Sequence, residues 1–251
     1  DIEDIKSKIT ERTRGIVIIN PNNPTGAVYS REILQQIADV AREHELVVFA
    51  DEIYEKITYE GAEAINMATI TGDDVLCMTF SGLSKAYRVC GYRAGWLAIT
   101  GPKENAKNYI EGITLLASMR LCSNVPAQHA ILTSLGGYQS IDELVAPGGR
   151  LYEQRTLAYR MLNEIDGITC EQADGALYLF PKIDTEKFNI KSDEQFMLDL
   201  LKDQKILFSH GRAFNWKDPD HFRLVFLPDT QTLTSALERL GNFMADYKQK
   251  H

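Results

Sequence analysis

Short apolar runs alternate with amphipathic stretches along the first half of the chain. Uniformly apolar runs predict four strands, at residues 16–19, 46–50, 75–80 and 95–100. The first run, "IVII", is typical of a strand that is buried on both faces. Residues 30–44 have helical spacing, with Ser30 as the expected N-cap. The buried face of this helix is expected to carry Ile33, Ile37, Val40 and Ala41.

Strands that alternate with helices predict an α/β layered domain with a mostly parallel sheet. The pattern changes after "PGGR" at residues 147–150. Beyond it we expect strands at residues 176–183, 205–210 and 222–228, and helices at residues 150–166, 192–203 and 229–249. This α+β layout predicts a boundary near residues 146–150, with a larger α/β domain over 1–147 and a small C-terminal domain, led by a long connecting helix, over 148–251.

The composition excludes several classes of function. A net charge of -8 and a pI near 5.2 argue against a nucleic-acid partner, which would need a basic face. No run approaches the roughly 20 apolar residues of a membrane-spanning helix, so we expect no membrane partner. The four cysteines form no CxxC pair, which favours a reducing cytoplasm over a disulfide framework or a metal site.

Polar residues gather directly after three of the predicted strands. "NPNNPTG" at residues 20–26 follows the first, Asp51, Glu52 and Tyr54 follow the second, and Ser81, Ser84 and Lys85 follow the third. Ligands of parallel sheets bind at the carboxyl ends of the strands. We therefore expect these side chains to converge on one rim of the sheet.

Lys85 and Arg93 predict a cofactor. Lys85 lies between small residues just after a buried strand, where partial desolvation lowers the pKa of an amine and frees it to attack a carbonyl. Eight residues later, Arg93 is flanked by Gly91 and Gly95 and offers a guanidinium that suits a phosphate. An imine-forming lysine with a phosphate anchor suggests pyridoxal 5′-phosphate (PLP). Asp51 is placed to keep the pyridine nitrogen of PLP protonated, and Asn23 and Tyr54 can donate to its phenolic oxygen.

These motifs resemble those of the fold-type I, class I/II aminotransferases. "NPTG" at 23–26 looks like the family's turn, and "DEIY" at 51–54 looks like its D-x-x-Y element. Ser84, Lys85 and Arg93 resemble the phosphate-binding serine, the Schiff-base lysine and the phosphate arginine. Arg223 in "HFRLVF" resembles the arginine that binds the substrate α-carboxylate, and Asn23 would also contact substrate. Each motif alone is common in loops and turns, and it is their joint order from Asn20 to Arg223 that favours the family.

The stretches "ASMRLCSNVPAQHA" and "GALYLFPKID" further resemble the bacterial alanine (glutamate–pyruvate) aminotransferase branch of AlaA type. The resemblance implies that residues 1–147 are the C-terminal portion of the large PLP-binding domain. Only 19 residues precede Asn20, so the chain looks like the C-terminal two-thirds of such an enzyme. A phosphate loop, an aromatic residue stacked on the cofactor and a substrate-closing arm would precede it. We therefore expect weak activity, or none, from this chain alone.

Three positions are left open by the resemblance. Arg88 stands where many relatives have a small residue, and it either adds charge near the phosphate or points to solvent. Ser81 and Ser84 are alternative phosphate donors, because Gly82 occupies the position where many relatives carry that serine. Arg120 could contact substrate or a neighbouring subunit, or be structural.

The resemblance implies a PLP-dependent transaminase that acts on an L-amino acid and a 2-oxo acid, with alanine/pyruvate and glutamate/2-oxoglutarate favoured. It implies a homodimer in the full-length protein. Two alternatives remain. A C–S β-lyase would use the same residues, and transamination differs from it because it yields a keto acid that retains its side chain. A non-catalytic, aminotransferase-like sensing domain would need a fused DNA-binding module, and these residues contain no basic helix-turn-helix.

Overall fold

The computed structural model describes residues 1–250, which divide into two compact units. The first unit consists of Asp1–Pro21, Val28–Thr58 and Glu63–Ile141. The second unit consists of Asn22–Ala27, Tyr59–Ala62 and the chain from Asp142 onward. Two short pieces of the N-terminal half, including the "NPTG" turn, therefore belong to the second unit.

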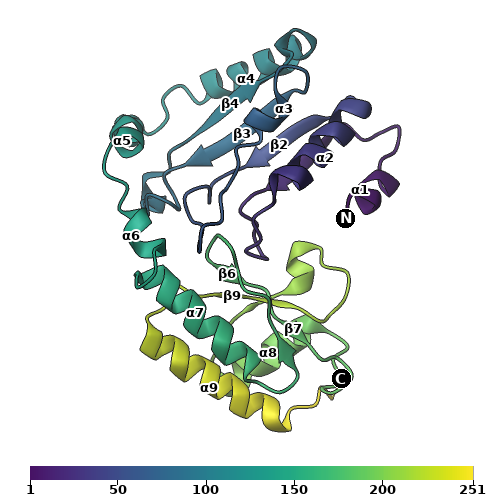
Figure 1. Ribbon diagram of the computed structural model, residues 1–251, viewed down its shortest axis with the longest axis vertical. Coiled ribbons are helices and arrows are strands. Elements are labelled where there is room, and N and C mark those ends of the chain that lie inside the picture. The colour runs from purple at the N-terminus through teal and green to yellow at the C-terminus, as the bar shows by residue number, and fades with distance from the viewer. Residues whose placement is uncertain (251) are drawn as a thin grey trace. The chain divides into compact units, whose positions relative to one another are not determined.

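The first unit combines a four-stranded sheet with flanking helices (Figure 1). Its strands are β1 (Gly15–Ile19), β2 (Val47–Asp51), β3 (Cys77–Gly82) and β4 (Gly95–Thr100). Its helices are α1 (Ile2–Ser7), α2 (Arg31–Glu43), α3 (Ala68–Thr71), η1 (Cys90–Tyr92), η2 (Lys103–Ala106), α4 (Lys107–Met119) and α5 (Val125–Gly136). A short helix, α6 (Ile141–Val145), follows at the junction of the two units.

The sheet has the strand order β1-β2-β3-β4. β1 pairs with β2 and β2 pairs with β3 in parallel, whereas β4 runs antiparallel to β3. The predicted α/β architecture with a mostly parallel sheet is confirmed. Because β1, β2 and β3 are parallel, their carboxyl ends lie at the same edge of the sheet.

One face of this sheet is covered by α2. Ser30 caps the helix by accepting a hydrogen bond from the Ile33 N–H, as its sequence predicts. Leu34, Ile37, Ala38, Val40 and Ala41 are buried, and all but Val40 join a core with residues of β1, β2, β3 and α3. The expectation for Ile33 is wrong, since its side chain is 42% exposed, whereas Leu34 is fully buried. The other three residues predicted for this face, Ile37, Val40 and Ala41, are buried as expected.

The opposite face of the sheet is only partly covered within residues 1–250, although Met78 of β3 is fully buried there. Val17 of β1 is 72% exposed, so the prediction that "IVII" is buried on both faces is wrong. Successive side chains of a strand point to opposite faces, and only the face of Ile18 packs against α2. Phe49 and Phe80, on adjacent strands, stack on each other with ring centres 6.5 Å apart, and Phe80 is 39% exposed.

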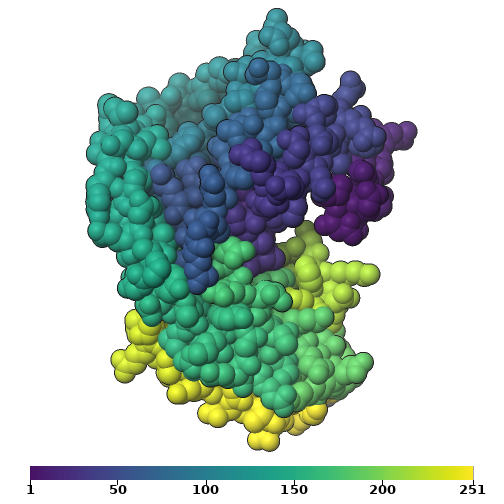
Figure 2. Space-filling model, viewed as in Figure 1, coloured from purple at the N-terminus to yellow at the C-terminus, as the bar shows by residue number. Residues whose placement is uncertain are grey.

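The second unit is an α+β assembly. Its helices are α7 (Arg150–Asn163), α8 (Asp193–Gln204), η3 (Gly211–Phe214) and α9 (Thr230–Asp246). Its strands are β5 (Ile168–Thr169), β6 (Tyr178–Leu179), β7 (Lys182–Ile183), β8 (Ser209–His210) and β9 (Phe222–Val225). β9 is the central strand of the antiparallel order β6-β9-β8, and β5 pairs with β7. α9 packs against α7 and α8, and its outer surface is the yellow band along the lower edge of Figure 2.

The strands of the second unit are shorter than their apolar runs predict. The run 176–183 contains two strands, β6 and β7, which lie in different sheets. In the run 205–210 only Ser209 and His210 pair with β9. Lys205 adopts a left-handed conformation that ends α8, so the strand cannot begin there.

Candidate active site

The turn after β2 places Asp51 and Tyr54 at the carboxyl edge of the first unit's sheet. Asp51 is the last residue of β2 and lies between Ile19 of β1 and Phe80 of β3. Its backbone carbonyl accepts a hydrogen bond from Asn20, and its Oδ1 accepts one from the Ile53 N–H at 3.1 Å. Tyr54 is 3% exposed. The carboxylate is therefore held in one orientation.

Lys85 lies on the bend that follows β3. Its Nζ lies 5.8 Å from the centre of the Tyr54 ring, and its side chain is half-buried. β3 is the parallel neighbour of β2, so Lys85 and Asp51 follow adjacent strand ends. The structure thus brings Asp51, Tyr54 and Lys85 to the same edge, as the sequence predicts.

The two ends of the loop between β3 and β4 lie next to each other, close to Lys85 in the sequence. The Leu83 N–H donates to the Ala94 carbonyl at 3.1 Å, and the adjacent residues Ser84 and Arg93 flank this pair. A side chain at Gly82 would meet the Ala94 oxygen at 2.9 Å, which gives a structural reason for glycine there. The close approach of these two strands leaves no room for a serine at this position.

Arg93 is exposed and has a positive φ of 50°. Its Nη1 donates to the Cys90 carbonyl at 2.6 Å. This hydrogen bond ties one terminal nitrogen of the guanidinium to the backbone of its own loop. Arg88 is also exposed and has a positive φ of 58°. The Arg88 guanidinium donates to the Ser140 hydroxyl at 2.6 Å, so it is tied to the residues that follow α5.

The other two predicted site residues, Asn23 and Arg223, meet in the second unit. The turn that contains Asn23 is closed by Asn22, whose Oδ1 accepts hydrogen bonds from the Thr25 N–H and hydroxyl. Asn23 Oδ1 accepts a hydrogen bond from Arg223 Nη1 at 2.9 Å, although 200 residues separate the two in sequence. Because the amide oxygen faces arginine, the Asn23 amide nitrogen is the group available to donate to a ligand.

Arg223 lies in the middle of the three-stranded sheet of the second unit. It pairs with Ser209 of β8, whose hydroxyl accepts a hydrogen bond from Nη2 at 3.4 Å. Tyr178 of β6 pairs with Val225 and therefore shares a face of the sheet with Arg223. Within residues 1–250 the Nε atom of Arg223 is buried and has no hydrogen-bond partner. A buried donor of this kind is costly unless a ligand accepts from it.

Glu52 is a buried acid that the sequence did not single out. It is 3% exposed and accepts hydrogen bonds from the Met67 N–H at 2.7 Å and from Asn66 Nδ2 at 2.6 Å. Burial raises the pKa of Glu52 to about 7, and the nearby Glu55 and Asp51 carboxylates raise it as well. From the sequence, Asp51 and Glu52 look like two neighbouring acids in solvent. The burial of Glu52 could not be predicted, because its hydrogen-bond partners lie 14 and 15 residues away.

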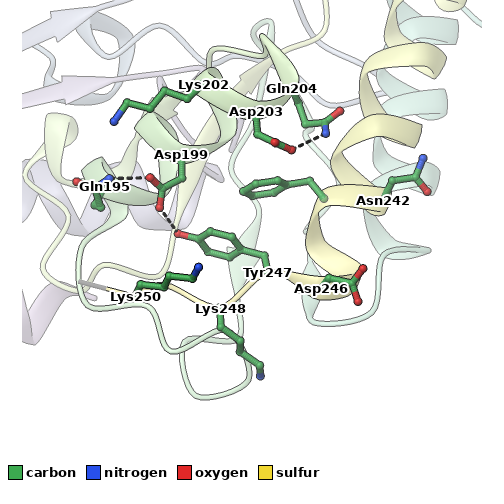
Figure 3. A pocket seen from close by; sticks show the side chains of 11 residues that line it. Gln195, Asp199, Lys202, Asp203, Gln204, Asn242, Asp246, Tyr247, Lys248 and Lys250 are labelled. Carbon is green, nitrogen blue, oxygen red and sulfur yellow. Dashed lines mark hydrogen bonds between the residues drawn. The ribbon is translucent and has the colours of Figure 1, made fainter.

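A recess of about 670 Å³ lies elsewhere in the second unit, between α8, α9 and the chain that follows α9 (Figure 3). Asp199 is one of its lining residues and accepts hydrogen bonds from Gln195 and from the Tyr247 hydroxyl. Burial and Asp199 raise the pKa of Tyr247. None of the seven predicted site residues lines this recess, so we do not assign the chemistry to it.

The family model for "Aminotransferase class I and II" matches residues 1–240. The chain belongs to the class I and II aminotransferases. It is 62% identical over 249 residues to "Alanine aminotransferase" of Mycobacterium tuberculosis, an alignment that covers 99% of this chain and 58% of the relative. It is 57% identical to "Glutamate-pyruvate aminotransferase AlaA" of Escherichia coli, over 99% of this chain and 61% of the relative.

Two solved aminotransferase structures share the fold. An aminotransferase from Escherichia coli matches with a TM-score of 0.98 and 56% identity, over all of this chain and 62% of that one. "Alanine aminotransferase from Pyrococcus furiosus" matches with a TM-score of 0.91 and 41% identity, over 98% of this chain and 61% of that one. The chain thus spans about three fifths of the length of these aminotransferases.

Within residues 1–250 no helix is long and apolar enough to cross a membrane. The same residues contain no group of three or more His, Cys, Asp or Glu side chains placed to hold a metal ion. The roles of the seven site residues, and the convergence of Asn23 with Asp51 and Lys85 on one rim, stay predictions.

Proposed function

We propose that this aminotransferase chain contributes to PLP-dependent transamination between an L-amino acid and a 2-oxo acid. Alanine/pyruvate and glutamate/2-oxoglutarate are the favoured pair, because the similar proteins of 57–62% identity have alanine or glutamate and pyruvate in their names. The observation that carries the proposal is the position of Lys85. Its amine lies against the ring of Tyr54, one strand away from Asp51.

The residues of the first unit fit PLP by the chemistry of their groups. Lys85 would hold the cofactor through its Nζ, Asp51 would pair with the ring nitrogen, and Tyr54 would donate to the ring oxygen together with Asn23 of the second unit. Arg93 and Ser84 would bind the phosphate. When bound, the cofactor supplies an electron sink that makes the substrate α-proton acidic. Once the incoming substrate amine has replaced it, the free Lys85 amine would take that proton at Nζ and return it to the carbon on the far side of the substrate nitrogen.

Arg223 would bind the α-carboxylate of either substrate. Its buried Nε and one N–H of Nη2 form an edge that matches a carboxylate in bidentate geometry. Asn23 at Nη1 and Ser209 at Nη2 hold the guanidinium plane in place. An amine that lacks a carboxylate would leave this buried donor without a partner, so the contact favours amino acids over simple amines.

The proposal includes the organisation of the protein around this site. Residues 1–147 would be the C-terminal portion of the large PLP-binding domain, and residues 148–251 the small C-terminal domain. We expect a homodimer in the full-length protein, a cytoplasmic location, and small amino and keto acids as substrates.

The test is the absorption spectrum, with PLP, of the purified full-length protein to which this chain belongs. We expect an absorption band of the imine between PLP and Lys85, and we expect it to be absent in Lys85→Ala. Alanine or glutamate should change this band, and the product should be the keto acid that retains its side chain. A band that persists in Lys85→Ala, or no band in the wild type, refutes the assignment. Release of a thiol from a sulfur amino acid would instead favour the lyase.

A further inference from the structure

Two aromatic rings lie against the guanidinium of Arg223. The centre of the guanidinium lies 4.6 Å from the Tyr178 ring and 4.7 Å from the Phe214 ring. Aromatic faces attract a cation at this distance and restrict the plane in which the group lies. With Asn23 and Ser209 at its edges, Arg223 is fixed in orientation as well as in position.

Two of the four groups around Arg223 belong to one short segment, residues 209–214. Ser209 opens the segment in β8, and Phe214 closes it in η3. A four-residue 3-10 helix has little hydrogen bonding of its own, so its position depends on what anchors it. A displacement of this segment would move both the hydroxyl at the edge of Arg223 and the ring on its face.

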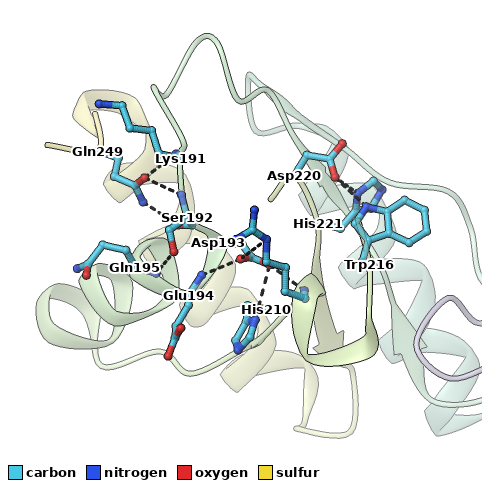
Figure 4. A network of polar contacts seen from close by, with 11 residues as sticks. Lys191, Ser192, Asp193, Glu194, Gln195, His210, Trp216, Asp220, His221 and Gln249 are labelled. Carbon is cyan, nitrogen blue, oxygen red and sulfur yellow. Dashed lines mark hydrogen bonds and ion pairs between the residues drawn. The ribbon is translucent and has the colours of Figure 1, made fainter. Parts of the chain in front are cut away.

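Asp193 anchors the segment from α8. Its side chain is fully buried, and its Oδ2 accepts a hydrogen bond from the Arg212 N–H at 2.9 Å. The same oxygen lies 3.6 Å from His210 Nδ1, and Oδ1 lies 3.8 Å from Arg212 Nε. Figure 4 shows Asp193 between the start of α8 and His210. One carboxylate therefore contacts the segment at two of its residues.

The needs of α8 explain only part of the position of Asp193, whose Oδ1 accepts a hydrogen bond from the Glu194 N–H at 3.0 Å. Ser192 already caps the helix by accepting from the Gln195 N–H at 3.2 Å. Glu194 supplies an exposed acidic side chain in the first turn. An additional carboxylate in that turn would ordinarily stay in water, because burying a charge costs free energy unless hydrogen bonds compensate. The compensation here comes from the Glu194 N–H and from residues 210–212.

We propose that Asp193 is a positioning residue for the substrate carboxylate. It holds residues 210–212, and through them Ser209 and Phe214 fix the plane of Arg223. The inference rests on the proposed function, in which Arg223 binds the α-carboxylate. Asp193 lies 30 positions before Arg223 in the sequence. It affects the affinity for substrate and the preference for substrates that carry a carboxylate.

The test uses the full-length protein and compares Asp193→Ala with Glu194→Ala, which removes the neighbouring exposed acid from the same helical turn. For Asp193→Ala we expect KM for alanine and pyruvate to rise by about tenfold and kcat to change less than about twofold, because the perturbed contact binds a non-reacting group. Slow turnover of ethylamine, which is alanine without its carboxylate, should be unchanged. Glu194→Ala should behave as the wild type. Asp193→Asn keeps an oxygen that accepts from the Arg212 N–H and should recover part of the loss.

If Asp193→Ala does not fold, Asp193→Asn and Phe214→Leu decide. Phe214→Leu removes one ring and leaves α8 intact, whereas Phe214→Tyr keeps the ring; only the first should raise KM. A normal PLP band together with an unchanged KM in the folded Asp193 variant and in Phe214→Leu overturns the positioning role. So does an equal loss of activity with alanine and ethylamine, which indicates a general structural effect. Loss of the PLP band in the wild type refutes the proposed function instead.

Discussion

Glu52→Gln removes a buried carboxylate from the turn that carries Asp51 and Tyr54. Glu52 is 3% exposed, and burial raises its pKa to about 7 from the ordinary value of 4.5. Between these two pH values the folded chain keeps a proton on Glu52 that the unfolded chain has released. The free energy of unfolding of the first unit should therefore fall as pH rises from about 4.5 to about 7.

The magnitude follows from the size of the pKa displacement. Each pKa unit corresponds to about 1.4 kcal/mol, so the full effect is up to about 3 kcal/mol, and most of it lies between about pH 5 and 8. Glutamine cannot ionise and should remove this slope. Its amide can accept from only one of the two donors, Met67 N–H and Asn66 Nδ2, so we also expect a pH-independent loss of about 1–2 kcal/mol.

The assay is urea unfolding at pH 5, 6, 7 and 8 in a Trp216→Phe background. Trp96 of β4 is then the only tryptophan, and its fluorescence reports on the first unit. Glu63→Gln, in the same connection and exposed, is the control and should keep the wild-type slope. If the curves of wild type and Glu52→Gln run parallel with pH, Glu52 does not titrate in this window and the reasoning is wrong.

Three further predictions test the fold. Leu34→Ala should cost about 2–5 kcal/mol in the free energy of unfolding because Leu34 is fully buried, whereas Ile33→Ala, at a 42% exposed side chain, should cost less than about 1 kcal/mol. Gly26→Ala should destabilise the second unit by at least about 2 kcal/mol, measured by urea unfolding, because φ is 74° and the new Cβ would lie 2.5 Å from another side chain. Burial raises the pKa of Cys170 to about 12, so iodoacetamide at pH 8 should alkylate it at least about 100-fold more slowly than the exposed Cys90; comparable rates, read by peptide mass spectrometry, would contradict this.

The first half of the fold could be predicted because its strands are continuous apolar runs between amphipathic helices. The buried residue in the first turn of α2 was harder to predict. Ile33 and Leu34 are both apolar, and only contact with the sheet decides that Leu34 is buried. The strands of the second unit are two to four residues long, and strand pairing, rather than hydrophobicity, sets their ends.

The candidate site shows the same division between local and tertiary information. Asp51, Tyr54 and Lys85 follow strand ends, so their neighbourhood could be read from the order of elements along the chain. The groups that orient Arg223 could not, because Tyr178 and Ser209 reach it through strand register. Asp193 acts through a backbone N–H of residue 212, which carries no sequence signal.

The second unit is assembled from three separate pieces of the polypeptide, and this limits how it can be separated from the rest. A gene fragment that begins at residue 142 would omit Asn23, the hydrogen-bond partner of Arg223. It would also omit Tyr59 and Glu60, and Tyr59 stacks on the fully buried Arg155 while Glu60 pairs with it. In such a fragment Arg155 would lose both the ring that covers it and the carboxylate of Glu60 that pairs with its charge. The unit is therefore not a module that recombination could exchange by a single cut, and domain-swap chimaeras should carry all three pieces together.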